Sequence, residues 1–173
     1  MQQRTNVKTK KVIIMALLLA IALTIFMIEA QIPPIVPIQG VKLGLANIIT
    51  LVVMYYIGSK EAVCILLMRI TIGSIFSGQI ISFSYSLIGG ILCLIAMLIF
   101  KNIFKGNVYI PLVSVIGAVA HNIGQILVAV FLINSTKIFY YLPILILSGI
   151  ITGFFTGYIV YYLSRRNILK KYL

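Results

Sequence analysis

Few side chains in this sequence could bind a ligand, and most of them fall inside apolar segments. The chain has one histidine, His121, with Asn122 beside it and Gln125 one turn further on. On a helix, His121 and Gln125 share one face, while Asn122 points about 100° away. Polar groups at membrane depth normally face other helices, a cavity or a substrate path. Two interpretations therefore stay open for this stretch: the wall of a binding site, or a hydrogen-bonded clamp between helices.

Arg69 lies in the middle of another apolar segment. An arginine there costs about 2.5–3.5 kcal/mol, so it needs a partner. Glu29 is the only acidic residue at comparable depth, which predicts a structural Glu29–Arg69 ion pair. A compatible hypothesis is that cationic side chains at this depth meet an anionic group of a ligand. The candidate ligand-binding residues are Lys42, Asn47, Arg69, His121, Asn122 and Gln125.

The composition is that of an integral membrane protein. Of its 173 residues, 62% are hydrophobic and 9% are charged, against about 45–50% and 25% in soluble domains. At about 20 residues per crossing, the length allows six transmembrane helices. We therefore predict an all-α bundle that forms a single transmembrane domain over residues 1–173, with short basic tails at 1–11 and 164–173. The net charge of +12 reflects basic residues at the ends of apolar runs, so we expect a lipid bilayer and no nucleic acid as partner.

The apolar runs and their breaks predict where the helices lie. We expect them over residues 11–31, 40–57, 62–76, 83–100, 110–133 and 140–163, with Pro111 and Pro143 in first turns, where proline is tolerated. With the amino terminus inside, eleven of the 14 basic residues fall on the inner side. This bias predicts a multi-pass protein of the cell membrane with both termini cytoplasmic. The polar residues then gather in the outer half, predicting an outward-open pocket capped by the proline-rich residues 32–39.

Two patterns of small residues concern helix packing. Ala16 and Ala20 are four apart on the first predicted helix, and Gly149, Gly153 and Gly157 form a ladder on the last. Both patterns allow close helix approach. For the glycines we favour packing within the chain, whereas the alanine pair could contact a separate partner helix.

Motifs of catalysis are missing from the sequence. The chain has no aspartate, no clustered cysteine and histidine, no Walker A loop and no Gly-x-Ser-x-Gly elbow. Cys64 and Cys93 lie inside apolar runs, as small buried residues do. We therefore expect no enzyme activity, no cofactor, no metal site and no ATP hydrolysis by this chain alone.

Several ordered blocks resemble a known bacterial family. They include Pro33-Pro34, the segment Gly40–Ile48, Arg69 followed by Gly73-Ser74, Ser86–Gly90 and Gly117–Gln125. Over about residues 12–163 the chain resembles the Gx transporter family, also labelled heptaprenyl diphosphate synthase component I. That family is similar to the six-helix substrate-binding (S) components of energy-coupling factor (ECF) transporters.

The resemblance implies a division of labour among subunits. In S components a small-molecule ligand binds on the outer side, beneath the loop between the first two helices. An Ala-x-x-x-Ala motif on the first helix, matched here by Ala16 and Ala20, contacts a transmembrane coupling subunit that works with two ATPases. The leading hypothesis is thus an S-component-like subunit that captures a small, anionic molecule.

Two alternatives remain open at this point. One is a non-catalytic accessory subunit of heptaprenyl diphosphate or quinone metabolism, or of a membrane redox chain, with a prenyl diphosphate synthase as partner. The other is an autonomous ion-coupled carrier that relies on Glu29.

Overall fold

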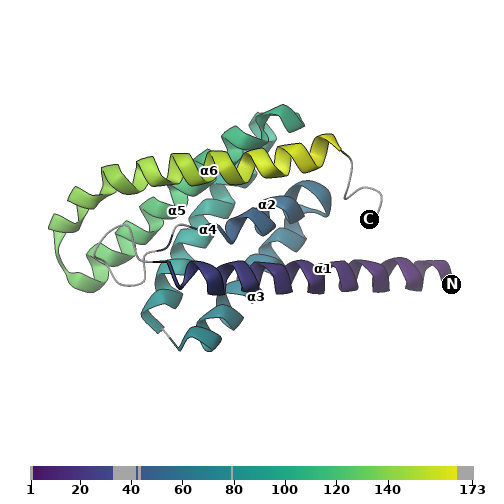
Figure 1. The fold of residues 1–173 in the computed structure, drawn as a ribbon, viewed down its shortest axis with the longest axis horizontal. Coiled ribbons are helices and arrows are strands. Elements are labelled where there is room, and N and C mark those ends of the chain that lie inside the picture. Colours follow the sequence, from purple (N-terminus) through teal and green to yellow (C-terminus); the bar gives the residue numbers. More distant parts are fainter. Residues whose placement is uncertain (1, 33–41, 43, 79, 167–173) are drawn as a thin grey trace.

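The computed structural model describes residues 2–32, 42, 44–78 and 80–166. These residues form an all-helical bundle, as predicted (Figure 1). The helices are α1 (Gln2–Glu29), α2 (Asn47–Tyr56), α3 (Ser59–Ser77), α4 (Ile80–Ile103), α5 (Ile110–Ile133) and α6 (Leu142–Arg165), with 3-10 helices η1 (Asn107–Tyr109) and η2 (Thr136–Tyr141). We call the end where α1 begins and α6 finishes, on the right of Figure 1, the basic end of the bundle.

Four segments of the described chain are long and apolar enough to cross a membrane. They are Thr9–Glu29, Ile81–Ile103, Asn107–Ile133 and Thr136–Arg165. This supports the predicted membrane protein, while six crossings remain a prediction. The remaining two helices differ for physical reasons, because α2 is short and α3 carries Lys60, Glu61 and Arg69.

The second helix is much shorter than predicted. We expected it from about residue 40, but α2 covers only Asn47–Tyr56. Gly44 just before it adopts a left-handed conformation, with φ of +79°, which ends any helical path there. Ten residues span about 15 Å, half of a hydrocarbon core of about 30 Å.

The carboxyl-terminal end of α2 is fixed near the basic end. The ammonium of Lys101 donates a hydrogen bond of 2.5 Å to the backbone oxygen of Met54 and lies 4.9 Å from the centre of the Tyr55 ring. A cation near the last carbonyls of a helix is favourable. The amino-terminal end of α2 must therefore lie well inside the bundle.

Helix α5 lies between α4 and α6 in close contact with both, and glycines allow the approach. The ladder Gly149, Gly153 and Gly157 faces α5, and Gly124 of α5 faces Gly89 of α4. A Cβ atom added at Gly124 would lie 2.8 Å from the Cα of Gly89. These contacts hold the middle of α5 rigidly between its neighbours.

We expect Gly153→Ala to destabilise the bundle. The new Cβ would lie 2.7 Å from the Cα of Val115, and backbone atoms of a packed helix cannot move aside easily. Overpacking of this kind costs about 1–3 kcal/mol, so the Tm of the purified protein should fall. Phe154→Leu, at the next and exposed position, is the matched control and should leave Tm nearly unchanged. An unaltered Tm for Gly153→Ala would show that α5 and α6 are packed more loosely than described.

Candidate ligand-binding site

The carboxylate of Glu29 binds the start of α2 from the end of α1. Its side chain is buried, at 4% exposure. One oxygen accepts a short hydrogen bond from the backbone N–H of Gly44, and the other accepts one of 3.3 Å from that of Ala46. Ala46 directly precedes α2 and supplies no side-chain cap. Glu29 therefore acts as a distant cap, with its negative charge at the positive end of the helix dipole.

Arg69 binds the first side chain of the same helix. Its guanidinium Nη2 donates a hydrogen bond of 2.9 Å to Oδ1 of Asn47, and both residues are buried. The predicted direct Glu29–Arg69 ion pair is not formed: the described chain has one side-chain ion pair, Lys11–Glu61. Glu29 and Arg69 attract each other only through space. The backbone of Gly44 and Ala46, just before α2, binds the carboxylate, and Asn47, the first residue of α2, binds the guanidinium.

The imidazole of His121 fills a slot between two glycines. A Cβ on Gly44 would lie 3.1 Å from its Cδ2, and a Cβ on Gly89 would lie 3.0 Å from its Nδ1. His121 is 4% exposed and interacts electrostatically with Arg69. The slot brings α5 against the segment before α2, so the histidine joins the same polar cluster.

Lys42 completes the cluster from the segment between α1 and α2. Its ammonium lies 3.7 Å from the centre of the Phe26 ring, and that ring packs on Gly73 of α3. Burial lowers the pKa of Lys42 below its usual value, and the charge of Glu29 opposes this shift. A cation over an aromatic face is stabilised by the ring but keeps its N–H donors available.

Two other candidates from the sequence lie elsewhere. The side-chain amide of Asn122 donates a hydrogen bond of 2.5 Å to the backbone oxygen of Leu145 on α6, which is a clamp between helices. Gln125 is completely buried, and neither its amide oxygen nor its nitrogen has a hydrogen-bond partner within the described part of the chain. Lys42, Asn47, Arg69 and His121 do come together, around Glu29.

Several polar atoms in this cluster have no hydrogen-bond partner among the described residues. They are Lys42 Nζ, Asn47 Nδ2 and Arg69 Nε. Native proteins leave few buried polar atoms unpaired, and each such atom needs an explanation. Three in one cluster, each able to donate a hydrogen bond, indicate a place for a ligand or water.

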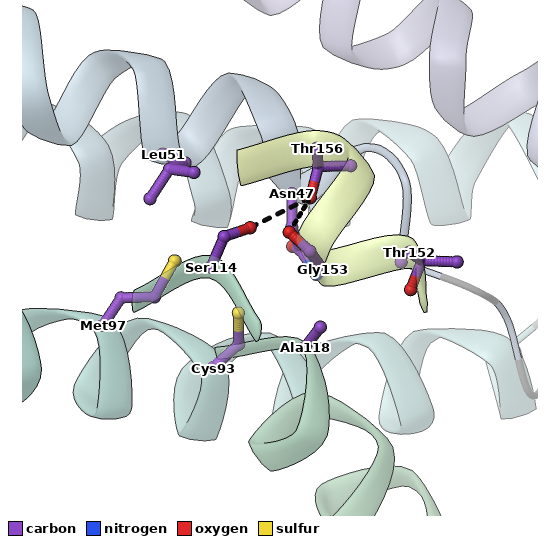
Figure 2. Close-up of a pocket in the computed structure, with 10 residues that line it drawn as sticks. Asn47, Leu51, Cys93, Met97, Ser114, Ala118, Thr152, Gly153 and Thr156 are labelled. Carbon is purple, nitrogen blue, oxygen red and sulfur yellow. Dashed lines mark hydrogen bonds between the residues drawn. The ribbon is translucent and has the colours of Figure 1, made fainter. Parts of the chain in front are cut away.

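A small cavity continues from this cluster between α2, α4, α5 and α6. Figure 2 shows its lining, with Asn47 near α6 and Cys93 and Met97 across from it. Ser114 and Thr156 are joined by a hydrogen bond of 2.9 Å on its wall. The cavity volume is about 10 Å³, roughly the room that one water needs. A larger ligand would require the surrounding elements to move apart.

The backbone groups of the site were not predicted. Gly44, Ala46 and Gly89 shape it as much as the charged side chains do. All three lie in sequence blocks that resemble the family, but their roles depend on contacts between distant segments. The proposed cap over the pocket falls almost wholly on residues 33–39, outside the described residues.

The comparison with protein families gives one clear result. A family model described as heptaprenyl diphosphate synthase component I matches residues 18–163, which is most of the chain. Neither the comparison with curated proteins nor that with solved structures gave a match. With this match over its helical bundle, the chain belongs to the heptaprenyl diphosphate synthase component I family.

Proposed function

We propose that this protein is the membrane-embedded, substrate-binding subunit of an ECF-type importer, and that it captures a small anionic molecule. The observation that carries the proposal is the buried set of unpaired polar atoms at the start of α2. Half-length helices whose amino-terminal ends point at anionic substrate groups are a recurrent arrangement in membrane transporters. A site of this kind binds a ligand and needs no reactive group.

The absence of aspartate supports a non-catalytic role. Catalytic prenyl diphosphate synthases use aspartate-rich motifs to hold magnesium and a diphosphate, and this chain has no aspartate. The family description names a component of a synthase, so this chain would be at most a partner of the catalytic subunit. Capture of a ligand for other subunits fits the residues better than chemistry.

Helix α1 offers a surface for such subunits. Ala16 and Ala20 are both exposed, and the α1 span is the least buried of the four candidate spans. Small side chains let a neighbouring helix approach closely without the help of a hydrophobic driving force. The exposed alanines therefore suit a transmembrane coupling subunit, whose ATPases would supply the energy that this chain cannot.

Enlarging this face should prevent assembly. We expect the double variant Ala16→Leu/Ala20→Leu to lose most of its coupling subunit, because leucine side chains hold the partner backbone away. The measurement is the yield of co-purified ATPases from membranes that express the tagged chain. Ile21→Phe enlarges an exposed residue at a different angle of the same helix and should assemble normally. Normal ATPase recovery with the double variant would remove α1 from the interface.

The alternative is a membrane accessory subunit of heptaprenyl diphosphate or quinone metabolism. The family description favours it, because it names a synthase component. This alternative predicts that the tagged chain co-purifies with a prenyl diphosphate synthase and with no ATPase. The same purification thus separates the two functions.

A further inference from the structure

The charges around the start of α2 do not balance. Two cations, Lys42 and Arg69, share one carboxylate, that of Glu29, and all three act on one another electrostatically. The undescribed residues 33–41 and 43 add no charge, since none of them is acidic or basic. With all three groups ionised, the cluster carries one excess positive charge in a largely buried setting, where an unpaired charge is costly. One bound monoanion would neutralise it.

The best position for an anion is already filled by Glu29. Its carboxylate accepts hydrogen bonds from the backbone N–H groups of Gly44 and Ala46, at the positive end of the α2 dipole. Asn47 and His121, both more than nine-tenths buried, lie around Gly44, and Asn47 has an unpaired side-chain nitrogen. These are the groups that would complete the coordination of a carboxylate or phosphate group.

Lys42 offers the displaced Glu29 carboxylate another partner. Glu29 and Phe26 are three residues apart on α1, so they lie on the same face of the helix. The Lys42 ammonium lies over the Phe26 ring with no hydrogen-bond partner in the described chain. A change of side-chain rotamer by Glu29 toward Phe26 would bring the carboxylate to this ammonium.

We propose that Glu29 occupies the anion site of the empty protein, and that a ligand carboxylate or phosphate displaces it from the N–H groups of Gly44 and Ala46 toward Lys42. The exchange changes only which charged groups are paired and involves no covalent step. The ligand anion pairs with Arg69 and the start of α2, Glu29 pairs with Lys42, and two anions then balance two cations. The inference rests on the proposed function only in requiring that the site binds a ligand.

The test compares how variants of the purified full chain bind sodium acetate and inorganic phosphate. Dissociation constants come from the rise in Tm with anion concentration at fixed ionic strength, with acetamide as the neutral control. Glu29→Gln should bind acetate roughly tenfold more tightly, because a neutral amide competes less well for the N–H groups than a carboxylate. Lys42→Met should bind it more weakly, because the displaced carboxylate loses its partner. In the double variant, the effect of Lys42→Met should shrink, since no carboxylate needs a new partner.

If Glu29 has only a structural role, Glu29→Gln should not bind acetate more tightly than the wild type. Weaker or unchanged acetate binding by Glu29→Gln would overturn the exchange, as would an equal response to acetate and acetamide. If Glu29→Gln does not fold, Glu29→Asp provides the same test, because its shorter side chain reaches the N–H groups less well. Anion exchange without co-purified ATPases would keep this inference and remove the importer. ATPases without an anion effect would do the reverse.

Discussion

Replacing Arg69 with glutamine is expected to produce the largest loss of ligand binding of any single change. Arg69 is the most deeply buried cation of the site, and its guanidinium also positions Asn47 at the start of α2. Removing one member of a buried charged pair costs about 2–5 kcal/mol, which corresponds to roughly 30-fold or more in affinity. The measurement is the dissociation constant for acetate and phosphate, determined from the dependence of Tm on anion concentration.

Arg69→Lys is the matched control for charge. It keeps a cation at this depth but loses the planar fork that can bind Asn47 and an anion together. We expect an affinity between those of the wild type and Arg69→Gln. Equal anion binding by all three proteins would show that the anion does not contact Arg69, and would leave Arg69 a purely structural residue.

Gly44→Ala should have the second largest effect. Gly44 has a left-handed conformation with φ of +79°, and an added Cβ would lie 3.0 Å from Nδ2 of Asn47 and 3.1 Å from Cδ2 of His121. The left-handed conformation alone costs a non-glycine residue about 1–2 kcal/mol. The new methyl group would also press on two polar side chains of the site. We expect a lower Tm and an anion affinity at least roughly tenfold lower, as a further loss of about 1.4 kcal/mol implies.

Gly78→Ala separates the two causes. Gly78 is also left-handed, with φ of +63°, but a Cβ there would meet nothing within 4 Å. This control should lower Tm by the conformational cost alone and leave anion binding unchanged. If both variants lower Tm equally and bind anions equally well, Gly44 does not shape the site.

The sequence predicted well the features that depend on local composition. Helix α5 begins and ends where the apolar run around His121 indicated, and Pro111 and Pro143 lie in the first turns of α5 and α6. Continuous apolar runs also made the all-helical membrane protein evident. In these cases each residue acts through its neighbours in the chain, so no knowledge of distant contacts is needed.

The site was predicted only in part, because its geometry depends on contacts between distant segments. We predicted a Glu29–Arg69 pair because Glu29 is the only acidic residue expected at the depth of Arg69. In the structure, Glu29 binds the backbone N–H of Ala46 and Arg69 binds the side chain of Asn47, so the two charged residues do not contact each other directly. The shortness of α2 was missed because Val41, Leu43 and Leu45 extend the apolar pattern upstream, and the sequence alone does not show that Gly44 takes a left-handed conformation.

The short helix α2 gives this bundle a feature that a helix crossing the whole membrane would not provide. The turn that leads into α2 places the backbone N–H groups of Gly44 and Ala46 against the buried carboxylate of Glu29. In the proposed exchange, the same groups bind an external anion when the carboxylate leaves. Glu29 would thereby stabilise the ligand-free protein and keep these N–H groups positioned for an anion.

The most direct test of the proposed function is native mass spectrometry of the tagged full chain, purified gently from its own membranes. We expect a complex with a transmembrane coupling subunit and two ATPases, together with a small anion that is absent from Arg69→Gln. A chain that carries only a prenyl diphosphate synthase, with no small anion bound to the wild type, would contradict it.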